Sequence, residues 1–239
     1  MKLESRRVIV VGAGSGIGRS VAIAASEAGA SVVLAGRKRE ALEATAALLK
    51  GPREVRPLDA SREDEVGAFF ETIGPFDHLV STASQGASGS ITELGTAAIE
   101  RAFAAKLWAP IFLVKHAARR IAREGSFTFF SGFRAVKPSP GASITSLVNG
   151  GLEAFTKAMA VELAPIRVNA ISPGVVDSGS FWDRLGTEAR DRLFSDFAQK
   201  APARRVGQPE DLAAATLFAM VNPFLTGTVL AVDGGGHLM

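Results

Sequence analysis

The chain has 239 residues, of which 47% are apolar and 21% are charged, a balance typical of a folded domain rather than a disordered chain. It contains no cysteine and no tyrosine, which excludes disulfides, thiolate metal sites and any mechanism that needs a phenol, and favours a cytoplasmic protein. The net charge is +3, from 27 basic and 24 acidic residues that are mixed along the chain, so we expect neither nucleic acid nor a membrane as a partner.

Short apolar, β-branched runs alternate with longer segments of helical character. Strands are predicted over residues 8–11, 31–35, 55–58, 78–80, 127–130, 168–171 and 229–232. Helices are predicted over 17–28, 39–50, from a capping Ser61 onward, over 96–122 and over 143–164. Apolar strands separated by helices predict a single α/β domain over 1–239, a doubly wound parallel sheet of the Rossmann type with helices on both faces.

Two stretches depart from this alternation. Residues 178–199 have no partner strand and are predicted as a loop or lid over a substrate site. Residues 212–232 are uncharged over a length that could cross a membrane, but Asn222-Pro223 and Thr226-Gly227-Thr228 would break a spanning helix at its centre. We interpret this stretch as a helix, a turn and a strand of the same domain.

A glycine-rich turn follows the first strand and opens the first helix. Glycines there permit a sharp exit from the strand, close approach of a pyrophosphate and tight packing of the helix, whose first N–H groups attract phosphate. A bare glycine run is weak evidence, but its place between a first strand and a helix predicts dinucleotide binding. The residues predicted to bind are Gly12, Gly14, Ser15, Gly16, Ile17 and Gly18.

The end of the second strand indicates which dinucleotide is bound. A carboxylate there would accept hydrogen bonds from the adenosine ribose, whereas an arginine would bind a 2′-phosphate. The residues are Arg37 and Lys38, with no acid beside them. They favour NADP(H) over NAD(H), although a solvated charge run at a helix start would look the same.

The chain resembles the short-chain dehydrogenase/reductase family over essentially its whole length. The resemblance rests on Gly12-x-x-x-Gly16-x-Gly18, on Asp59 after the third strand, on the run 167–174 (Arg-Val-Asn-Ala-Ile-Ser-Pro-Gly) and on the run 227–235. It implies an adenine contact at Asp59, which as a lone residue could equally cap the start of a helix. The cofactor contacts it implies beyond the glycine turn are Asp59, Ala60, Ala83, Pro173, Gly174, Val176 and Ser178.

The same resemblance implies an Asn-Ser-Tyr-Lys catalytic set, and this sequence departs from it everywhere. Thr145 stands at the tyrosine position, Asn149 at the lysine position and Gly132, beside Ser131, at the serine position; Lys106 stands at the asparagine position. A tyrosine has a pKa of about 10, but an aliphatic alcohol is near 15.7, and surroundings shift a pKa by about 3–5 units. Thr145 therefore cannot replace the tyrosine as a proton donor.

Lys106 is the replacement acid with suitable chemistry, because burial lowers the pKa of a lysine from about 10.4. Ser131 could hydrogen-bond a substrate carbonyl, and Thr145 or Asn149 could orient it. The plainer alternatives are a Lys106 that extends to the surface, a structural hydroxyl at Ser131, and ordinary helix residues at Thr145 and Asn149.

Three functions are therefore open. The first is an NADP(H)-dependent oxidoreductase that transfers hydride to or from a small carbonyl or alcohol with a non-standard proton donor. The second is a catalytically silent NADP(H)-binding regulator, and the third is a structural subunit. The resemblance implies a homodimer or homotetramer in which the helices over 96–122 and 143–164 form one contact. No metal site is expected, because no two histidines have ligand spacing.

Overall fold

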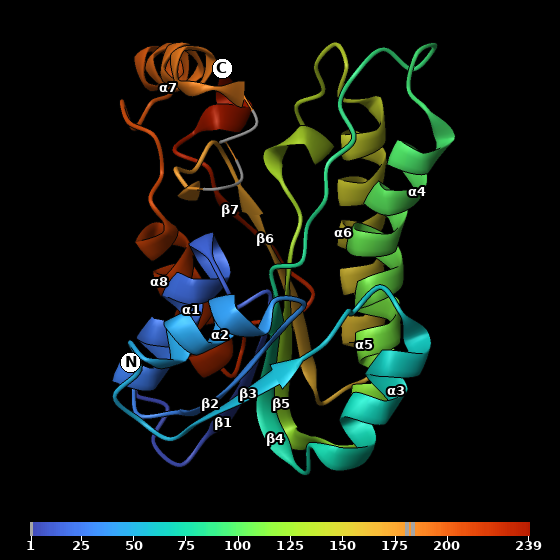
Figure 1. Cartoon of the computed structure of the whole chain (residues 1–239), viewed down its shortest axis with the longest axis vertical. Coiled ribbons are helices and arrows are strands. Elements are labelled where there is room, and N and C mark those ends of the chain that lie inside the picture. Colours follow the sequence, from blue (N-terminus) through green and yellow to red (C-terminus); the bar gives the residue numbers. More distant parts are fainter. Residues whose placement is uncertain (1, 180–181, 183–184) are drawn as a thin grey trace.

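A seven-stranded sheet forms the centre of the molecule in the computed structural model, which describes residues 2–179, 182 and 185–239 (Figure 1). Every neighbouring pair of strands is parallel, in the order β3-β2-β1-β4-β5-β6-β7. The chain therefore builds outward first to one side of β1 and then to the other, which leaves a switch point between β1 and β4. The strands are β1 (Arg7–Val11), β2 (Ser31–Gly36), β3 (Arg53–Pro57), β4 (Phe76–Ser81), β5 (Ile121–Phe130), β6 (Arg167–Pro173) and β7 (Val229–Val232).

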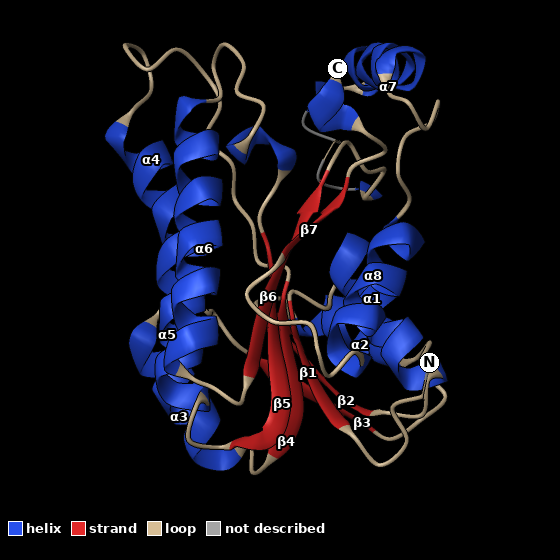
Figure 2. Cartoon of the chain, turned by 180° about the vertical axis from the view of Figure 1, so that it is seen from behind, coloured by secondary structure: helices blue, strands red, loops and turns tan. Residues whose placement is uncertain are grey.

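Helices cover both faces of this sheet (Figures 1 and 2). One face carries α1 (Gly16–Glu27), α2 (Arg39–Ala46) and α8 (Pro209–Val221), and the other carries α3 (Glu63–Thr72), α5 (Ala109–Ala117) and α6 (Ser143–Glu162). The helical run that leads into α5 begins with α4 (Thr96–Phe103) and passes through the π-helical turn η1 (Ala104–Trp108).

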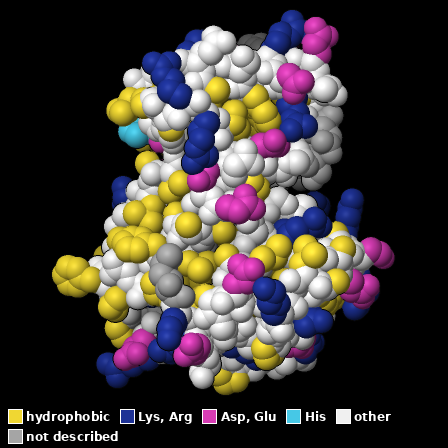
Figure 3. Space-filling view, turned by 90° about the vertical axis from the view of Figure 1, so that its left-hand side faces the viewer, with side chains coloured by type: hydrophobic (Ala, Val, Ile, Leu, Met, Phe, Trp, Pro, Cys, Tyr) yellow, Lys and Arg dark blue, Asp and Glu magenta, His cyan; other side chains and the backbone are white. Residues whose placement is uncertain are grey.

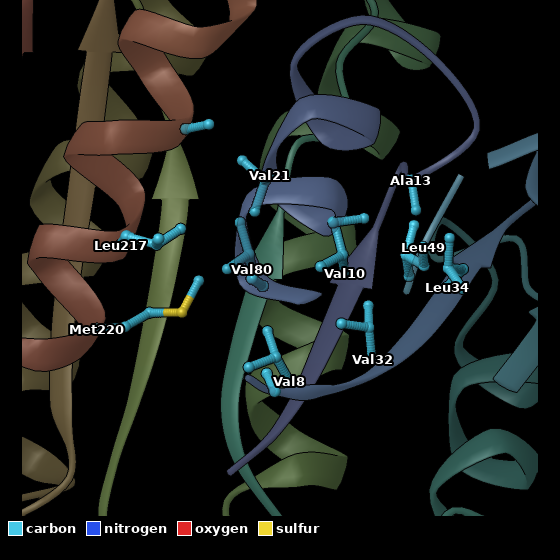
Figure 4. Packing of buried hydrophobic residues seen from close by; sticks show 14 of the residues in the cluster. Val8, Val10, Ala13, Val21, Val32, Leu34, Leu49, Val80, Leu217 and Met220 are labelled. Atoms are coloured by element: carbon cyan, nitrogen blue, oxygen red, sulfur yellow. The ribbon is translucent and has the colours of Figure 1, made fainter. Parts of the chain in front are cut away.

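The core is divided into two layers by the sheet, because side chains alternate along each strand. On β1, Val8 and Val10 pack with α1 and α8 in one layer, while Ile9 and Val11 pack in the other. Figure 4 shows the first layer, in which Val10 and Val80 of the sheet lie near Val21 of α1. Both layers are needed to bury strands that are apolar on both faces.

The predicted α/β fold is confirmed, with corrections at element boundaries. The third strand lies at Arg53–Pro57 rather than 55–58, and α2 ends at Ala46 rather than near residue 50. The predicted helix over 96–122 ends at Ala117, because β5 already begins at Ile121. Ser61 does not cap α3: Arg62 is the residue before the helix, and the Ser61 hydroxyl donates to Asp59 Oδ1 at 2.6 Å instead.

The predicted lid is largely helical in its second half, where α7 (Thr187–Lys200) lies over the carboxyl end of the sheet (Figure 1). Positions 180, 181, 183 and 184 of this segment lie outside the described residues. Basic and acidic side chains are interspersed on the face that includes α7 and α8, with apolar side chains grouped between them (Figure 3). Within the described part of the chain, none of the helices has the length and apolarity to cross a membrane.

Candidate active site

A cavity of about 1100 Å³ opens at the carboxyl ends of the strands. Its wall is built from the residues that follow β1, β2, β3, β4, β5 and β6, and from α6 and α7. This is the place where an open parallel sheet forms a crevice, because the connections diverge at the switch point. The predicted cofactor turn and the predicted catalytic positions therefore lie in one space.

The turn between β1 and α1 has the shape that a phosphate-binding cradle needs. Gly12 and Gly16 adopt positive φ angles of +91° and +51°, which side chains rarely tolerate. A Cβ on Gly18 would lie 2.1 Å from Gly12 O, so only glycine lets α1 come this close to the turn. Ser15 is the N-cap and makes no side-chain cap hydrogen bond, which leaves its hydroxyl and the first N–H groups of α1 for a ligand.

Most residues predicted to contact the cofactor line this cavity. They are Gly12, Ser15, Gly16, Ile17, Gly18, Arg37, Asp59, Ala60, Ala83, Pro173, Gly174, Val176 and Ser178. Two predicted residues are not on the cavity wall. Gly14 is packed against α2, where a Cβ would lie 3.1 Å from the Cβ of Ala41, and Lys38 is the exposed residue that precedes α2.

Arg37 and Asp59 lie on the part of the wall that follows β2 and β3. Arg37 is exposed and forms no ion pair with any described residue. Asp59 Oδ1 accepts hydrogen bonds from the Ser61 N–H at 3.0 Å and from the Ser61 hydroxyl. The carboxylate thus closes the turn before α3 without capping the helix, whose N-cap is Arg62, and it also borders the cavity.

Lys106 points into the protein rather than along its surface. It sits on the π-helical turn η1, is 7% exposed, and its Nζ donates to Phe130 O at 2.7 Å and to Ser131 O at 2.9 Å. Desolvation by burial lowers the pKa of Lys106 to about 8, because the charged form loses hydration. The alternative in which this side chain extends to the surface is therefore wrong.

Ser131 is oriented by a carboxylate that the sequence did not suggest. Its hydroxyl donates to Glu153 Oε1 at 2.9 Å, with a longer contact of 3.4 Å to Ile171 O. Glu153 lies one helical turn after Asn149 on α6, and that i,i+4 spacing is the signal that could have found it. Because the Ser131 hydroxyl donates its hydrogen bond to Glu153, the same proton is not directed at a substrate carbonyl.

Thr145 and Asn149 both line the cavity from α6, but they differ in their partners. The Thr145 hydroxyl donates to Ala87 O at 3.0 Å, which fastens α6 to the loop after β4. Asn149 is 3% exposed, and its Oδ1 has no hydrogen-bond partner among the described residues. A Cβ on Gly132 would lie 2.9 Å from Asn149 Nδ2, so the amide occupies the space that a side chain at position 132 would need.

The α7 side of the cavity is fastened to the rest of the wall by aromatic and ionic contacts. Phe197 of α7 meets Phe133 edge to face, with ring centroids 6.4 Å apart. The indole N–H of Trp182 donates to Val176 O at 2.6 Å, and Arg190 pairs with Asp177 at 2.9 Å. These contacts hold the predicted lid over the end of β6.

Four basic residues of the cavity wall were not predicted from the sequence. They are Arg101, Arg134, Lys137 and Lys200. Arg134 belongs to η2 (Phe133–Ala135), which follows the carboxyl end of β5 almost directly. Its position after a central strand is the signal that could have identified it, because such residues line the crevice of a parallel sheet.

The sequence and the structure were compared with known proteins. A family model described as enoyl-(acyl carrier protein) reductase matches residues 12–237. The short-chain dehydrogenase/reductase ATR9 of Stachybotrys chlorohalonatus is 32% identical over 99% of this chain and 98% of its own length. The chain belongs to the short-chain dehydrogenase/reductase family. A second relative, carbonyl reductase family member 4 of Danio rerio, is 31% identical over 98% of this chain and 99% of its own.

A solved structure of the short-chain dehydrogenase/reductase type adds a likeness in three dimensions. It is a crystal structure of a small-chain dehydrogenase in complex with NADPH, 33% identical, with a TM-score of 0.84 over 99% of this chain and 100% of that chain. No cluster of three or more potential metal-ligating side chains occurs among the residues that the structure describes.

Proposed function

We propose that this short-chain dehydrogenase/reductase is an NADP(H)-dependent oxidoreductase that acts on a small carbonyl or alcohol. The observation that carries the proposal is the single cavity, which extends from the glycine turn and Arg37 to Lys106 and Asn149. The solved small-chain dehydrogenase that binds NADPH supports the cofactor type.

The residues of the cavity fit this cofactor. We propose that Ser15, the first N–H groups of α1 and Arg37 hold its phosphates, and that the unpaired Oδ1 of Asn149 accepts a hydrogen bond from a ribose hydroxyl. Pro173 at the end of β6, with Gly174, Val176 and Ser178 after it, would border the nicotinamide. When bound, this group supplies or accepts the hydride.

We propose Lys106 as the proton donor for carbonyl reduction. Two of its three N–H groups are used by Phe130 O and Ser131 O, which leaves one for a substrate oxygen. In reduction the carbonyl carbon gains the hydride, the oxygen takes a proton from the Lys106 ammonium, and the neutral amine is protonated again by solvent. Thr145, Asn149 and Ser131 would position the substrate, the two hydroxyl oxygens as acceptors for an alcohol, because their protons are donated to Ala87 O and Glu153.

A second candidate function is a silent NADP(H)-binding regulator. It is favoured by the same hydrogen bonds, because a Lys106 that joins η1 to β5 and a Ser131 that donates to Glu153 both have structural uses.

We propose a homodimer or homotetramer, in which helices 96–117 and 143–162 form one contact. This is supported by the exposed apolar side chains that these helices carry, namely Trp108 (51% exposed), Leu147 (54%) and Val161 (81%).

Two measurements test the proposed function. Binding is followed by the change in NADPH fluorescence on mixing, and turnover by carbonyl-dependent loss of NADPH absorbance over a broad panel of aldehydes and ketones. An oxidoreductase should show both. Binding without turnover would favour the silent regulator, and absence of binding would refute the cofactor assignment.

A further inference from the structure

The wall of the cavity carries more positive than negative charge. Six basic residues line it, against two acidic ones, Asp59 and Asp196. Asp59 lies after β3, and Asp196 is engaged by Lys200 of its own helix at 2.6 Å. The remaining cations are Arg37 after β2, Arg101 on α4, and a group at the end of β5: Lys106, Arg134 and Lys137.

Arg134 is the member of this group whose surroundings are most informative. It is half-buried, and desolvation lowers the pKa of its guanidinium; no carboxylate contributes to that shift. Its guanidinium lies 4.8 Å from the centre of the Phe133 ring, and its one hydrogen bond among the described residues is a long contact of 3.5 Å to Lys137 O. A partly desolvated guanidinium has five N–H donors, so most of its hydrogen-bonding capacity is left for a ligand.

Other basic residues of the wall add to the positive charge of the cavity that Arg134 lines. Lys137 and Arg101 line the same cavity, and neither forms an ion pair with a described residue. Lys106, also without a carboxylate partner there, adds a buried charge. Like charges that line one cavity repel one another, and an anion bound among them would relieve that repulsion.

We propose that the substrate is a carbonyl compound bearing a carboxylate or phosphate group, and that Arg134, assisted by Lys137, binds this anion. The inference rests on the proposed function and names the substrate class of that site. Arg134 is a specificity-determining residue in this arrangement, because its planar fork matches two oxygens of a carboxylate or phosphate. A cationic substrate is disfavoured by the same charges.

The test compares matched ligands that differ only in charge. In the first series, each pair consists of a keto acid and its neutral primary amide. In the second series, each pair consists of a carbonyl compound with a phosphate monoester and the same compound with a free, neutral hydroxyl group. Binding to the NADPH-loaded protein is measured by calorimetry, and turnover by loss of NADPH absorbance. The variants are Arg134→Gln, Arg134→Lys and, as a remote control of equal charge change, Arg123→Gln, whose side chain is exposed near the amino end of β5.

The wild-type protein and Arg123→Gln should bind the anionic member at least about tenfold more tightly than the neutral one. Arg134→Gln should lose most of this preference and leave the affinity for the neutral member unchanged, and Arg134→Lys should restore part of it. The series with the larger preference identifies carboxylate or phosphate as the natural group.

Equal affinity for charged and neutral members of every pair would overturn the proposal, as would an Arg134→Gln variant that weakens both members alike. Failure of the proposed function gives a different pattern: the anion binds with the stated preference but no carbonyl compound is turned over. If NADPH itself does not bind, the same titrations on the unloaded protein still decide the anion preference.

Discussion

Lys106 shows how a single side chain can be prepared for acid chemistry by its surroundings. The side chain is buried, its Nζ donates hydrogen bonds to two backbone carbonyls, and no described carboxylate offsets the lost hydration. Because the cost of desolvation falls on the charged form alone, the pKa of the ammonium moves toward neutrality. Proton release at physiological pH therefore becomes possible without a phenol.

The pH dependence of reduction follows from that shift. Reduction needs the protonated amine, whose pKa is lowered to about 8, so kcat/KM should be level below pH 8 and fall about tenfold per pH unit above it. With Lys106 as the proposed base, oxidation would need the neutral amine, so its kcat/KM should rise about tenfold per pH unit up to pH 8 and be level above it.

The control for this profile is Lys106→Met, which should abolish turnover in both directions while NADPH affinity stays within a few-fold of the wild type. Wild-type turnover in Lys106→Met would remove Lys106 from the mechanism.

Arg37 is expected to decide the choice between the two pyridine nucleotides. Arg37→Ala should weaken NADP(H) binding by about tenfold or more and change NAD(H) binding little, because only the former has a 2′-phosphate. Calorimetry with both cofactors measures the difference. Arg123→Ala, which removes an equally exposed arginine far from the cavity, serves as the control. Equal losses for the two cofactors would contradict a phosphate contact.

At the scale of elements, α1 packs close to the turn at Gly12 because one of its residues is a glycine. Its third residue, Gly18, faces the Gly12 carbonyl so closely that any Cβ would overlap it. The helix can therefore direct its N-terminal N–H groups at the cavity only while this position is glycine.

Gly18→Ala should accordingly lower both the free energy of unfolding, by about 1–3 kcal/mol, and NADPH affinity. Gly150→Ala is the matched control, because a Cβ at Gly150 on α6 meets nothing within 4 Å and should stabilise the helix by up to about 1 kcal/mol. Urea denaturation and NADPH titration of both variants provide the comparison. A Gly18→Ala variant that behaves like Gly150→Ala would show that the helix can move away without penalty.

The elements were predictable where a local pattern determined them, and less so elsewhere. Six of the seven strands follow from apolar runs and the glycine turn from its spacing, whereas β3, with the sequence Arg-Glu-Val-Arg-Pro, was predicted two residues too late. The π-helical turn at Ala104–Trp108 was missed because one extra residue in a turn leaves the apolar pattern of a long helix almost unchanged. The spacing of Glu153 from Asn149 and the place of Arg134 after β5 could have marked both as wall residues, but the Ser131–Glu153 hydrogen bond depends on how α6 approaches β5, which no local pattern records.

At the scale of the whole molecule, stability depends on two apolar layers that share one sheet. Phe127 and Phe129 of β5 are fully buried in the same layer, with their rings stacked 6.2 Å apart. The cavity lies beyond the carboxyl ends of these strands, so its shape depends on this packing.

Phe129→Ala should therefore lower the free energy of unfolding by about 3–5 kcal/mol, since it leaves a cavity in a close-packed layer. Phe224→Ala, at a side chain that is 98% exposed, should change the free energy by less than about 0.5 kcal/mol. Urea denaturation at fixed protein concentration measures both. A small effect at Phe129 would mean that the layer repacks around the vacancy.

The close approach of the Asn149 amide to Gly132 affects any attempt to restore the family's catalytic serine at position 132 of this chain. A serine at 132 and an asparagine at 149 compete for the same volume, so Gly132→Ser on its own would displace the amide rather than add a hydroxyl to an otherwise intact pocket. Adding a serine at 132 therefore also moves the Asn149 amide, and the two positions have to be redesigned together.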